Sequence, residues 1–426
     1  MGDMTKKGVV VGGSVAGLMA AVVLRDAGYS VTVLERIAEV EFLDRGSGLG
    51  IRAEVSEFFD VYGQSDVYLK TALGGAFVTV MKQDGSIDGK LPLAQRTKSS
   101  SWSSLMDSLH ALFNDSSRGS GEILYETKVV DITENKSENN VSVVHETADG
   151  LQTIPNVDIV IGADGSNSTV RTLMMGPVPR TQAGYVCIRS RCPGSVLSDD
   201  FAALYPDSAM GQVNDGISLT SYLIPSKTSS TGGKPDVLIA YYTHMTPDAI
   251  REHFLGVDGH QYSHSLPAGQ LRPHLLQPLK DRLRGVLCPQ FQKIIDAVPA
   301  ESVLIQAVSD LRAGQNSFLD GKVLLVGEAQ SVTRSHTFRA TASSAFQAML
   351  LTPVLQGTSQ ILDWSKTCLE YTDLLRREAI EVGEILIGAN HFEGVSAWIA
   401  QNKIMKETDE KCMRIKEEAL IRTRER

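Results

Sequence analysis

The sequence lacks the features that mark a disulfide-stapled, zinc-binding or membrane-spanning protein. Its five cysteines are scattered, and none forms a C-x-x-C pair, so neither a disulfide framework nor a metal site is indicated. We expect these cysteines to be small buried residues. No apolar run approaches the ~20 residues needed to span a bilayer, and the N-terminal residues do not resemble a signal peptide. These absences favour a soluble, cytoplasmic protein.

The chain also lacks a concentrated positive charge. Its 426 residues carry a formal net charge of −9, and the positive residues stay dispersed until the C-terminal end. Such a distribution gives no basic field to attract nucleic acid, which is therefore not expected as a partner. The 37 glycines instead suggest close backbone approach to a small-molecule ligand.

The first informative segment is a βαβ pattern that runs from Lys7 to Arg36. Residues 9–11 form a continuous β-branched run that ends in glycines, as a strand buried on both faces would. Residues 15–27 carry apolar and small residues at helical spacing, and Gly28 stands where a helix would stop. Residues 30–34 then predict a second strand. This arrangement places a pyrophosphate on a helix N-terminus.

The first turn of this unit fits G-x-G-x-x-G with a serine in place of the middle glycine. It consists of Gly12, Gly13, Ser14, Val15, Ala16 and Gly17. Glu35 follows Gly17 by 18 residues and ends the second strand, where a carboxylate can accept hydrogen bonds from a ribose. The turn therefore predicts dinucleotide binding, against the alternative of a purely structural turn. Arg36 is either a solvated charge or a contact to the adenosine.

A second strand-to-helix turn lies at residues 157–171. An apolar strand over residues 159–161 leads into Asp164 and Gly165, and a helix start follows. The alternative is an ordinary turn in which Asp164 or Ser166 caps the helix.

A third segment of this kind spans residues 321–351. Residues 323–326 predict another buried strand, which ends in Gly327 and Glu328, and a helix follows from about Thr341. Together the three segments cover most of the chain in a fixed order.

These three motifs resemble, in the same order, those of the para-hydroxybenzoate hydroxylase-like superfamily of FAD-dependent aromatic-ring hydroxylases. Five further segments resemble its 2,6-dihydroxypyridine hydroxylase-like branch: residues 45–49, 100–102, 185–189, 265–269 and 334–337. The resemblance implies that FAD is bound, with Asp164 near the pyrophosphate and Glu328 at the ribityl chain. Arg45, Gly48 and Ala340 are then further cofactor contacts, and residues after Glu328 pass under the flavin.

Three residues depart from the family pattern in this flavin-contacting segment. Glu328 replaces an aspartate, Ser335 a proline and Ala340 a glycine. Alanine permits less close backbone approach than glycine, so FAD binding could differ here. An alternative function is therefore a non-redox cyclase or isomerase on the same scaffold.

The predicted fold class is α/β, with a Rossmann-like FAD-binding domain, a mixed-sheet substrate domain and C-terminal helices. The FAD-binding domain is assigned residues 1–70, 155–180 and 300–350, the substrate domain 71–100 and 181–290, and the helical region 351–426. In the substrate domain, residues 219–224 and 237–242 predict strands, and residues 226–234, rich in Ser, Thr and Gly, predict a mobile loop between them. Within that region, residues 402–426 carry Lys, Glu and Arg at i, i+4 spacing, typical of an exposed helix. A solvated face is expected there, with a role in a homodimer as the alternative.

The resemblance implies a monooxygenase that uses NAD(P)H and O₂ to hydroxylate or epoxidise an aromatic, heteroaromatic or enol-type molecule, in catabolism or natural-product tailoring. His336 is the candidate base, because imidazole titrates near neutral pH; a structural histidine is the alternative. Arg189 is expected to hold an anionic substrate or flavin, or else to form a surface salt bridge. The tyrosines that could line the pocket or fill the core are Tyr185, Tyr222, Tyr241 and Tyr242.

Overall fold

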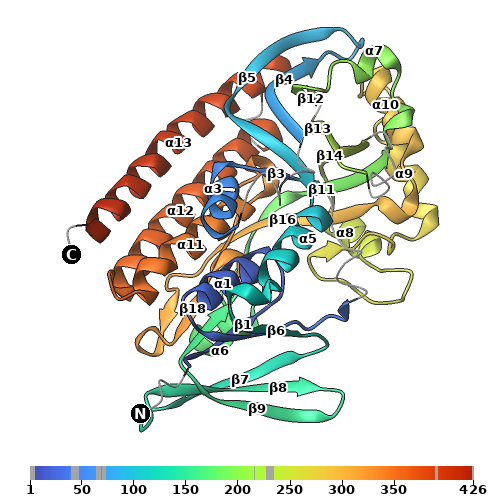
Figure 1. The fold of residues 1–426 in the computed structure, drawn as a ribbon. Coiled ribbons are helices and arrows are strands. Elements are labelled where there is room, and N and C mark those ends of the chain that lie inside the picture. The colour runs from blue at the N-terminus through green and yellow to red at the C-terminus, as the bar shows by residue number, and fades with distance from the viewer. Residues whose placement is uncertain are drawn as a thin grey trace.

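The computed structural model describes residues 5–39, 48–63, 69, 73–214, 216–226, 235–388 and 392–424 (Figure 1). Within these ranges the chain forms a six-stranded sheet, a ten-stranded sheet and a small three-stranded sheet, with helices packed around them. The predicted α/β class is confirmed. No helix in these ranges combines the length and apolarity needed to cross a membrane. All five cysteines are buried and free, as expected.

The six-stranded sheet contains all three strands that precede the predicted motifs. Its order is β17-β18-β10-β1-β2-β6, with β1 (Lys7–Val11), β2 (Ser30–Leu34), β6 (Gly121–Leu124), β10 (Ile159–Gly162), β17 (Ser317–Phe318) and β18 (Val323–Leu325). Every neighbouring pair is parallel except β17 and β18. Because parallel strands end at the same sheet edge, the turns after β1, β10 and β18 lie next to one another.

Strand β1 is buried on both faces, as its continuous apolar run predicts. Val10 points into the largest apolar cluster, whereas Val9 and Val11 point into another cluster. Helices cover the first face: α1 (Val15–Asp26), α3 (Ala53–Tyr62), α5 (Trp102–Phe113) and α11 (Ala340–Leu355). The other face packs against the small sheet of β7 (Lys128–Asn135), β8 (Asn140–Thr147) and β9 (Gly150–Val157), and near α6 (Thr169–Met175).

The ten-stranded sheet is mixed, as predicted for the substrate domain. Its order is β15-β16-β11-β14-β13-β12-β4-β5-β3, with β19 paired to β16. Its strands are β3 (Gly48–Ile51), β4 (Leu73–Met81), β5 (Ile87–Ser101), β11 (Thr181–Pro193), β12 (Ser208–Asn214), β13 (Ile217–Ile224), β14 (Asp236–His244), β15 (Ser265–Leu266), β16 (Leu304–Arg312) and β19 (Ser331–Val332). Only the β4–β12 pair is parallel among these described pairs. The strands predicted at residues 219–224 and 237–242 are thus confirmed as β13 and β14.

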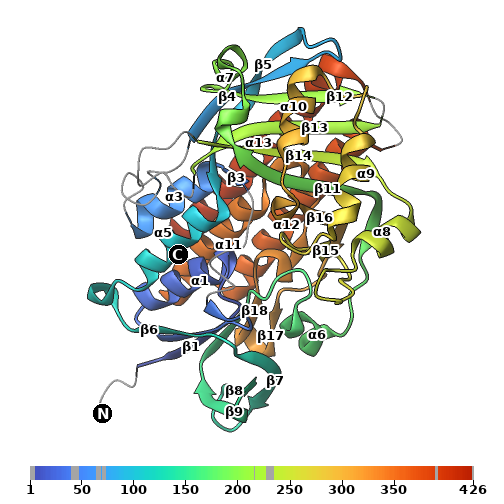
Figure 2. The same cartoon turned by 90° about the vertical axis from the view of Figure 1, so that its right-hand side faces the viewer.

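The two faces of this sheet have different neighbours. One face packs on a cluster that includes the short helices α8 (Pro247–His253), α9 (Leu276–Asp281) and α10 (Pro289–Ala297), which Figure 2 shows in front of the strands, with α7 (Asp199–Ala202) above them. The opposite face looks towards the six-stranded sheet and the C-terminal helices. Side chains alternate between these faces along β11 and β14.

Two long helices end the chain, as the pattern of the tail predicts. Helix α12 (Ile361–Leu386) packs beside α11, and α13 (Gly394–Arg424) runs along α12 and crosses β5 (Figure 1). Residues 402–426 were expected to be a solvated helix, but α13 buries one face. Its buried residues recur at helical spacing: Trp398, Gln401, Met405, Thr408 and Cys412.

The predicted domain boundaries remain a proposal. Strands β6 to β8 and most of β9 come from residues that the boundaries left unassigned, and β16, assigned to the FAD-binding part, pairs within the ten-stranded sheet. The loop predicted over residues 226–234 lies outside the described residues after Ser226.

Candidate active site

The first glycine turn packs so closely that two of its glycines cannot be replaced without movement. Gly12 has a φ of +101°, and a Cβ there would lie 2.5 Å from the carbonyl oxygen of Ala163. A Cβ on Gly17 would lie 1.8 Å from the carbonyl oxygen of Gly12. Ser14 is the N-cap of α1 and makes no side-chain capping bond. Helix α1 has no side-chain cap and no acidic residue in its first turn, so the N–H groups at its N-terminus can bind an anionic group of a ligand.

Glu35 lies beside this turn, where the sequence placed it. It is buried, and its carboxylate accepts hydrogen bonds from the backbone N–H of Gly13 at 2.8 Å and of Ile37 at 3.0 Å. A carboxylate has about four lone-pair sites, so these two bonds fix Glu35 and leave acceptor capacity for a ribose. Arg36 is exposed to solvent.

The third motif packs directly on the first and contacts the second. Gly327 has a φ of +60°, and a Cβ there would lie 2.6 Å from the Cβ of Ala16. The Nη1 of Arg171, from the helix of the second motif, donates to the carbonyl oxygen of Ala329 at 2.8 Å. Since Gly12 touches Ala163 of the second motif, all three motifs meet at one place.

Asp164 organises the second turn. Its Oδ2 accepts hydrogen bonds from the backbone N–H of Thr169 at 2.6 Å and Val170 at 3.0 Å, and the hydroxyl of Ser168 bonds to its Oδ1. Burial raises the pKa of Asp164, and these hydrogen bonds oppose the shift. Asp164 thus caps α6, which was the structural alternative for this residue. A contact from Asp164 or the adjoining Gly165 to the pyrophosphate remains a prediction.

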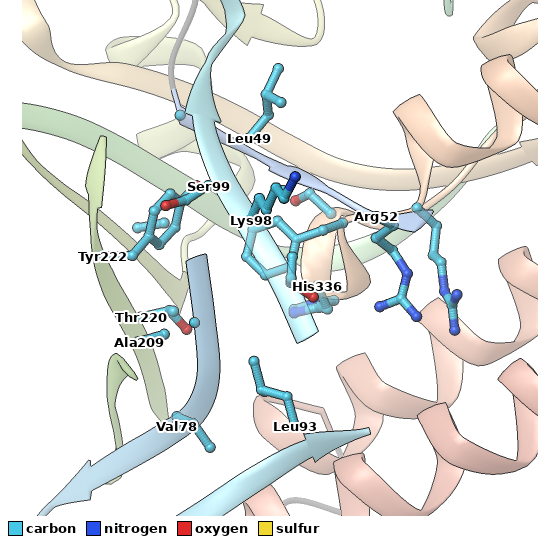
Figure 3. A pocket seen from close by; sticks show the side chains of 18 of the residues that line it. Leu49, Arg52, Val78, Leu93, Lys98, Ser99, Ala209, Thr220, Tyr222 and His336 are labelled. Atoms are coloured by element: carbon cyan, nitrogen blue, oxygen red, sulfur yellow. The ribbon is translucent and has the colours of Figure 1, made fainter. Parts of the chain in front are cut away.

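A cavity of about 610 Å³ lies between the ten-stranded sheet and the segment that leads from Glu328 into α11, with α13 at its side (Figure 3). Five predicted site residues line it: Gly48, Arg189, Glu328, His336 and Ala340. They come from β3, from β11 and from the segment after β18. The residues predicted to contact the cofactor and those predicted to contact the substrate therefore line the same cavity. Arg45 falls outside the described residues.

Glu328 brings a carboxylate to the cavity wall. Burial raises its pKa, while the positive charges of Arg180 and Arg189 pull the pKa down. Ala340, at the start of α11, also faces the cavity and is exposed to it. The acidic residue of the third motif therefore reaches the same space as the predicted substrate residues.

His336 is buried and is held by aromatic neighbours. Its ring stacks on Tyr242 with centroids 4.0 Å apart, and its Nε2 lies 2.9 Å from the hydroxyl of Tyr185. Arg334 donates to that hydroxyl oxygen at 3.4 Å. In the tautomer in which Tyr185 donates to Nε2, the imidazole proton sits on Nδ1, which has no partner among the described residues.

The expectation that His336 titrates near neutral pH is not met. Burial, followed by the positive charges of Arg334 and Arg189, lowers the pKa of His336 to about 3. The imidazole is therefore neutral at physiological pH, and its Nε2 is hydrogen-bonded to Tyr185. The role of base for His336 stays a prediction, and the lowered pKa makes the imidazole a weaker proton acceptor than an ordinary histidine.

Strand alternation decides which of the other candidates reach the cavity. Arg189, Tyr222 and Tyr242 point to the cavity face, whereas Tyr241 packs into the core on the opposite face. Tyr185 lies behind His336 and does not line the cavity. Arg189 donates to Gln306 Oε1 at 3.0 Å, and no carboxylate forms an ion pair with it in the described ranges.

The cavity has a wall that the sequence did not predict. Trp398, Gln401 and Met405 of α13 line it, at i, i+3 and i+7 spacing. That spacing is the only sequence signal for this wall, and it lies in a helix whose abundant charges indicate solvent exposure.

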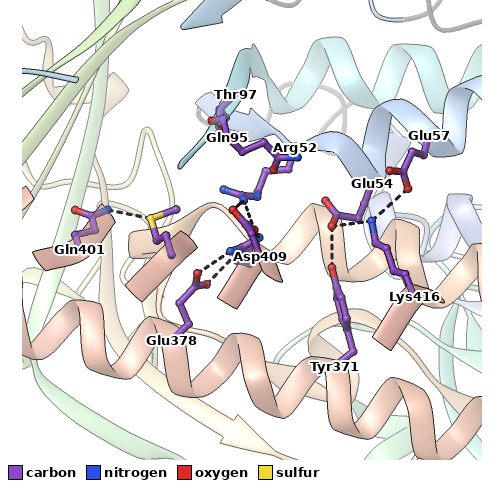
Figure 4. Close-up of polar contacts among 12 residues, drawn as sticks. Arg52, Glu54, Glu57, Gln95, Thr97, Tyr371, Glu378, Gln401, Asp409 and Lys416 are labelled. Atoms are coloured by element: carbon purple, nitrogen blue, oxygen red, sulfur yellow. Dashed lines mark hydrogen bonds and ion pairs between the residues drawn. The ribbon is translucent and has the colours of Figure 1, made fainter. Parts of the chain in front are cut away.

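A charged network fastens α13 next to the cavity (Figure 4). Arg52 donates to both oxygens of Asp409 at 2.8 and 3.0 Å, and Arg339 pairs with Asp409 at 2.7 Å and with Glu378 at 2.7 and 2.9 Å. The Arg339–Asp409 contact is an ion pair without hydrogen-bond alignment. Lys416 pairs with Glu54 at 3.0 Å. Asp409 thus joins two cavity-lining arginines from distant parts of the chain.

Comparison with known proteins gives one consistent result. Two family models, an FAD binding domain and an FAD binding domain-like region, match residues 6–187 and 182–310. The chain is 28% identical over 358 residues to 2,6-dihydroxypyridine 3-monooxygenase of Paenarthrobacter nicotinovorans, covering 83% of this chain and 84% of the relative.

Two solved structures share the fold. The 2,6-dihydroxypyridine-3-hydroxylase of Arthrobacter nicotinovorans has a TM-score of 0.77 at 24% identity, over 92% of this chain and 95% of that one. Klebsiella pneumoniae HpxO, complexed with FAD and uric acid, has a TM-score of 0.72 at 19% identity, over 96% of each chain. The chain contains an FAD binding domain, and it is an FAD-dependent monooxygenase of the aromatic-hydroxylase type.

Proposed function

We propose that this enzyme uses NAD(P)H and O₂ to hydroxylate a planar, electron-rich ring, such as a hydroxylated heteroaromatic, in the 610 Å³ cavity. One observation carries the proposal. Glu328 follows Gly327, which packs on the glycine turn at Ala16, and it lines the same cavity as Arg189 and His336. A cofactor that extends from the turn to Glu328 would therefore end beside the substrate candidates.

The residues present fit FAD. The uncapped N-terminus of α1 suits a pyrophosphate, and Glu35 is fixed beside it with free acceptor capacity for a ribose. Glu328 would accept hydrogen bonds from the ribityl hydroxyls, and Gly48 and Ala340 would lie along the ring system. When bound, FAD supplies the redox chemistry between NAD(P)H, O₂ and substrate.

Arg189 and His336 would orient the ring. A guanidinium is always charged, and because no carboxylate pairs with Arg189 in the described ranges, it can hold a phenolate or enolate oxygen. The neutral His336 would donate from Nδ1 to a second polar atom of the ring. Both residues favour the ionised form of the ring, which is the more electron-rich form. The remaining walls exclude water from the reacting ring.

A spectroscopic and kinetic experiment tests this function. Purified protein is expected to show the visible absorbance of bound FAD and to consume NADPH or NADH faster when 2,6-dihydroxypyridine or a related phenol is added. O₂ uptake and product mass should increase in step. A yellow protein that never oxidises NAD(P)H but converts a substrate anaerobically would contradict the proposal. That result would favour the non-redox alternative, which the relatives do not support.

A further inference from the structure

The α13 wall of the cavity contains a buried polar side chain that lacks a full set of partners. Gln401 is 7% exposed and lines the cavity. Its only described hydrogen bond runs from Nε2 to the sulfur of Met405 at 3.5 Å, and its Oε1 has no partner in the described residues. Figure 4 shows Gln401 beside that sulfur on α13. A thioether is a weak acceptor, so the amide is almost unused by the protein.

The surroundings of Gln401 make this arrangement costly. The neighbouring cavity residues Val78, Leu93, Leu386 and Trp398 are apolar or aromatic. Figure 3 shows Val78 and Leu93 at one end of the cavity, away from Leu49 and Ser99. Leaving an amide oxygen unsatisfied in such a place costs about 1–3 kcal/mol. Because Gln401 destabilises the protein without ligand in this way, its amide is explained best by a hydrogen bond that forms when a ligand binds.

Trp398 adds a second unused polar atom to the same wall. It is 6% exposed, one turn before Gln401, and its Nε1 also has no hydrogen-bond partner in the described ranges. Its indole packs closely on Gly211 of β12, where a Cβ would come within 2.5 Å of Cζ2. This contact fixes the indole, so the wall is rigid and its polar groups cannot turn to solvent.

We propose that Gln401 is a specificity-determining residue that binds the polar edge of the substrate ring. A carboxamide presents an acceptor and a donor side by side. Its complement is a ring edge with adjacent N–H and C=O groups, as in a lactam or the pyridone form of a hydroxypyridine, which forms two hydrogen bonds with the amide. The inference rests on the proposed function for the identity of the reaction, but the binding itself can be tested without turnover.

The cavity places Gln401 and Arg189 in one ligand space. Arg189 comes from β11 of the large sheet, whereas Gln401 comes from α13. A planar ring held by Gln401 at one edge and by Arg189 at an oxygen would have two fixed points. Two fixed points define the orientation of the ring in its plane, which is what selective attack on one carbon requires.

The test compares binding of 2-pyridone with binding of N-methyl-2-pyridone, which keeps the carbonyl but cannot donate. The FAD-loaded wild type, Gln401→Met and Thr408→Val are titrated by flavin absorbance and by thermal melting. Thr408 is buried two turns further along α13 and does not line the cavity, so it is the matched control. Methionine keeps the length of glutamine and removes the amide.

We expect the wild type and Thr408→Val to bind 2-pyridone about tenfold more tightly than the N-methyl compound, because methylation removes the one N–H that the Oε1 of Gln401 would accept; tenfold corresponds to about 1.4 kcal/mol. Gln401→Met should lose that discrimination. Its melting temperature without ligand should equal or exceed that of the wild type, since an unsatisfied polar group is removed.

Three outcomes would overturn the proposal: no binding of 2-pyridone by the wild type, unchanged discrimination in Gln401→Met, or a melting temperature several degrees lower in that variant, which would show a structural role. Failure of the proposed function is a separate result. It would appear as Gln401-dependent binding without NAD(P)H oxidation for any ring compound.

Discussion

The ion pairs of Asp409 provide the sharpest test of how the cavity is held together. Asp409 bridges Arg52 and Arg339, whose side chains are 2% and 1% exposed, while its own is 22% exposed. In Asp409→Asn the two arginines stay buried, and Arg52 loses the carboxylate that accepts both of its hydrogen bonds. Arg339 keeps its bonds to Glu378. The substitution therefore leaves the buried Arg52 without the carboxylate that pairs with it in the described ranges.

Removing one partner of a buried ion pair lowers the free energy of unfolding by about 3–5 kcal/mol. Because Asp409 is partly exposed, we expect the lower end of this range, about 3 kcal/mol. The entropy of unfolding is roughly 2.1 cal/mol/K per residue, or about 0.9 kcal/mol/K for this chain. Asp409→Asn should therefore lower the melting temperature by about 3 °C. Glu410→Gln removes the same charge from the next, exposed position of α13 and should change it by less than about 1 °C. Equal melting temperatures for the two variants would refute the idea that the ion pairs of Asp409 stabilise the packing of α13.

Three further predictions follow from single residues. Lowering the pH from 7 to 5 should reduce the free energy of unfolding of the wild type by about 2 kcal/mol more than that of His336→Asn, as measured by urea unfolding. The reason is that His336 has a pKa of about 3 in the folded state against an ordinary 6.5, so the folded state binds fewer protons in this range. Equal pH dependence of the unfolding free energy in the two proteins would contradict the lowered pKa. Gly17→Ala should abolish retention of FAD on purification, since its Cβ would lie 1.8 Å from a carbonyl oxygen, whereas Gly314→Ala, with no atom within 4 Å of its Cβ, should retain it. Glu328→Ala should weaken FAD binding by about ten- to a hundredfold in a fluorescence titration, because hydrogen bonds to a charged group contribute about 1.5–3 kcal/mol; unchanged affinity would remove Glu328 from the cofactor site.

Local sequence was sufficient for the nucleotide-binding turn. The strand, turn and helix predicted between residues 7 and 34 match β1, α1 and β2 closely. This success has a physical cause, since a doubly buried strand, a glycine turn and a small-residue helix are each encoded by neighbouring residues. The second turn shows the limit of this reasoning. Asp164 was correctly placed at the end of a strand, but only the structure shows that its carboxylate is used to cap α6.

The rest of the site depends on contacts between distant residues. Asp409 and Lys416 are indistinguishable in sequence from the charges of a solvated helix, because an i, i+4 pattern does not reveal a partner such as Arg52, 357 positions away. The same holds for His336. Its residue type suggests titration near neutral pH, but burial and neighbouring cations set its pKa. The sequence therefore identified the glycine turn, whose function depends on its local backbone conformation, better than residues such as His336, whose protonation depends on contacts with distant parts of the chain.

The charges around the cavity explain why α13 matters for more than stability. Arg52 and Arg339 both line the cavity, and Asp409 with Glu378 neutralises them. Because their charges are compensated, the lining cations left to act on a ligand are Arg189 and the more exposed Lys98, neither of which forms an ion pair in the described ranges. A helix that supplies Asp409 to this network and Gln401 to the cavity thus influences both the charge and the hydrogen bonding that a substrate meets. If that reasoning holds, loss of Asp409 should strengthen the preference for anionic ring compounds over neutral ones, because Arg52 would then add positive charge to the cavity wall.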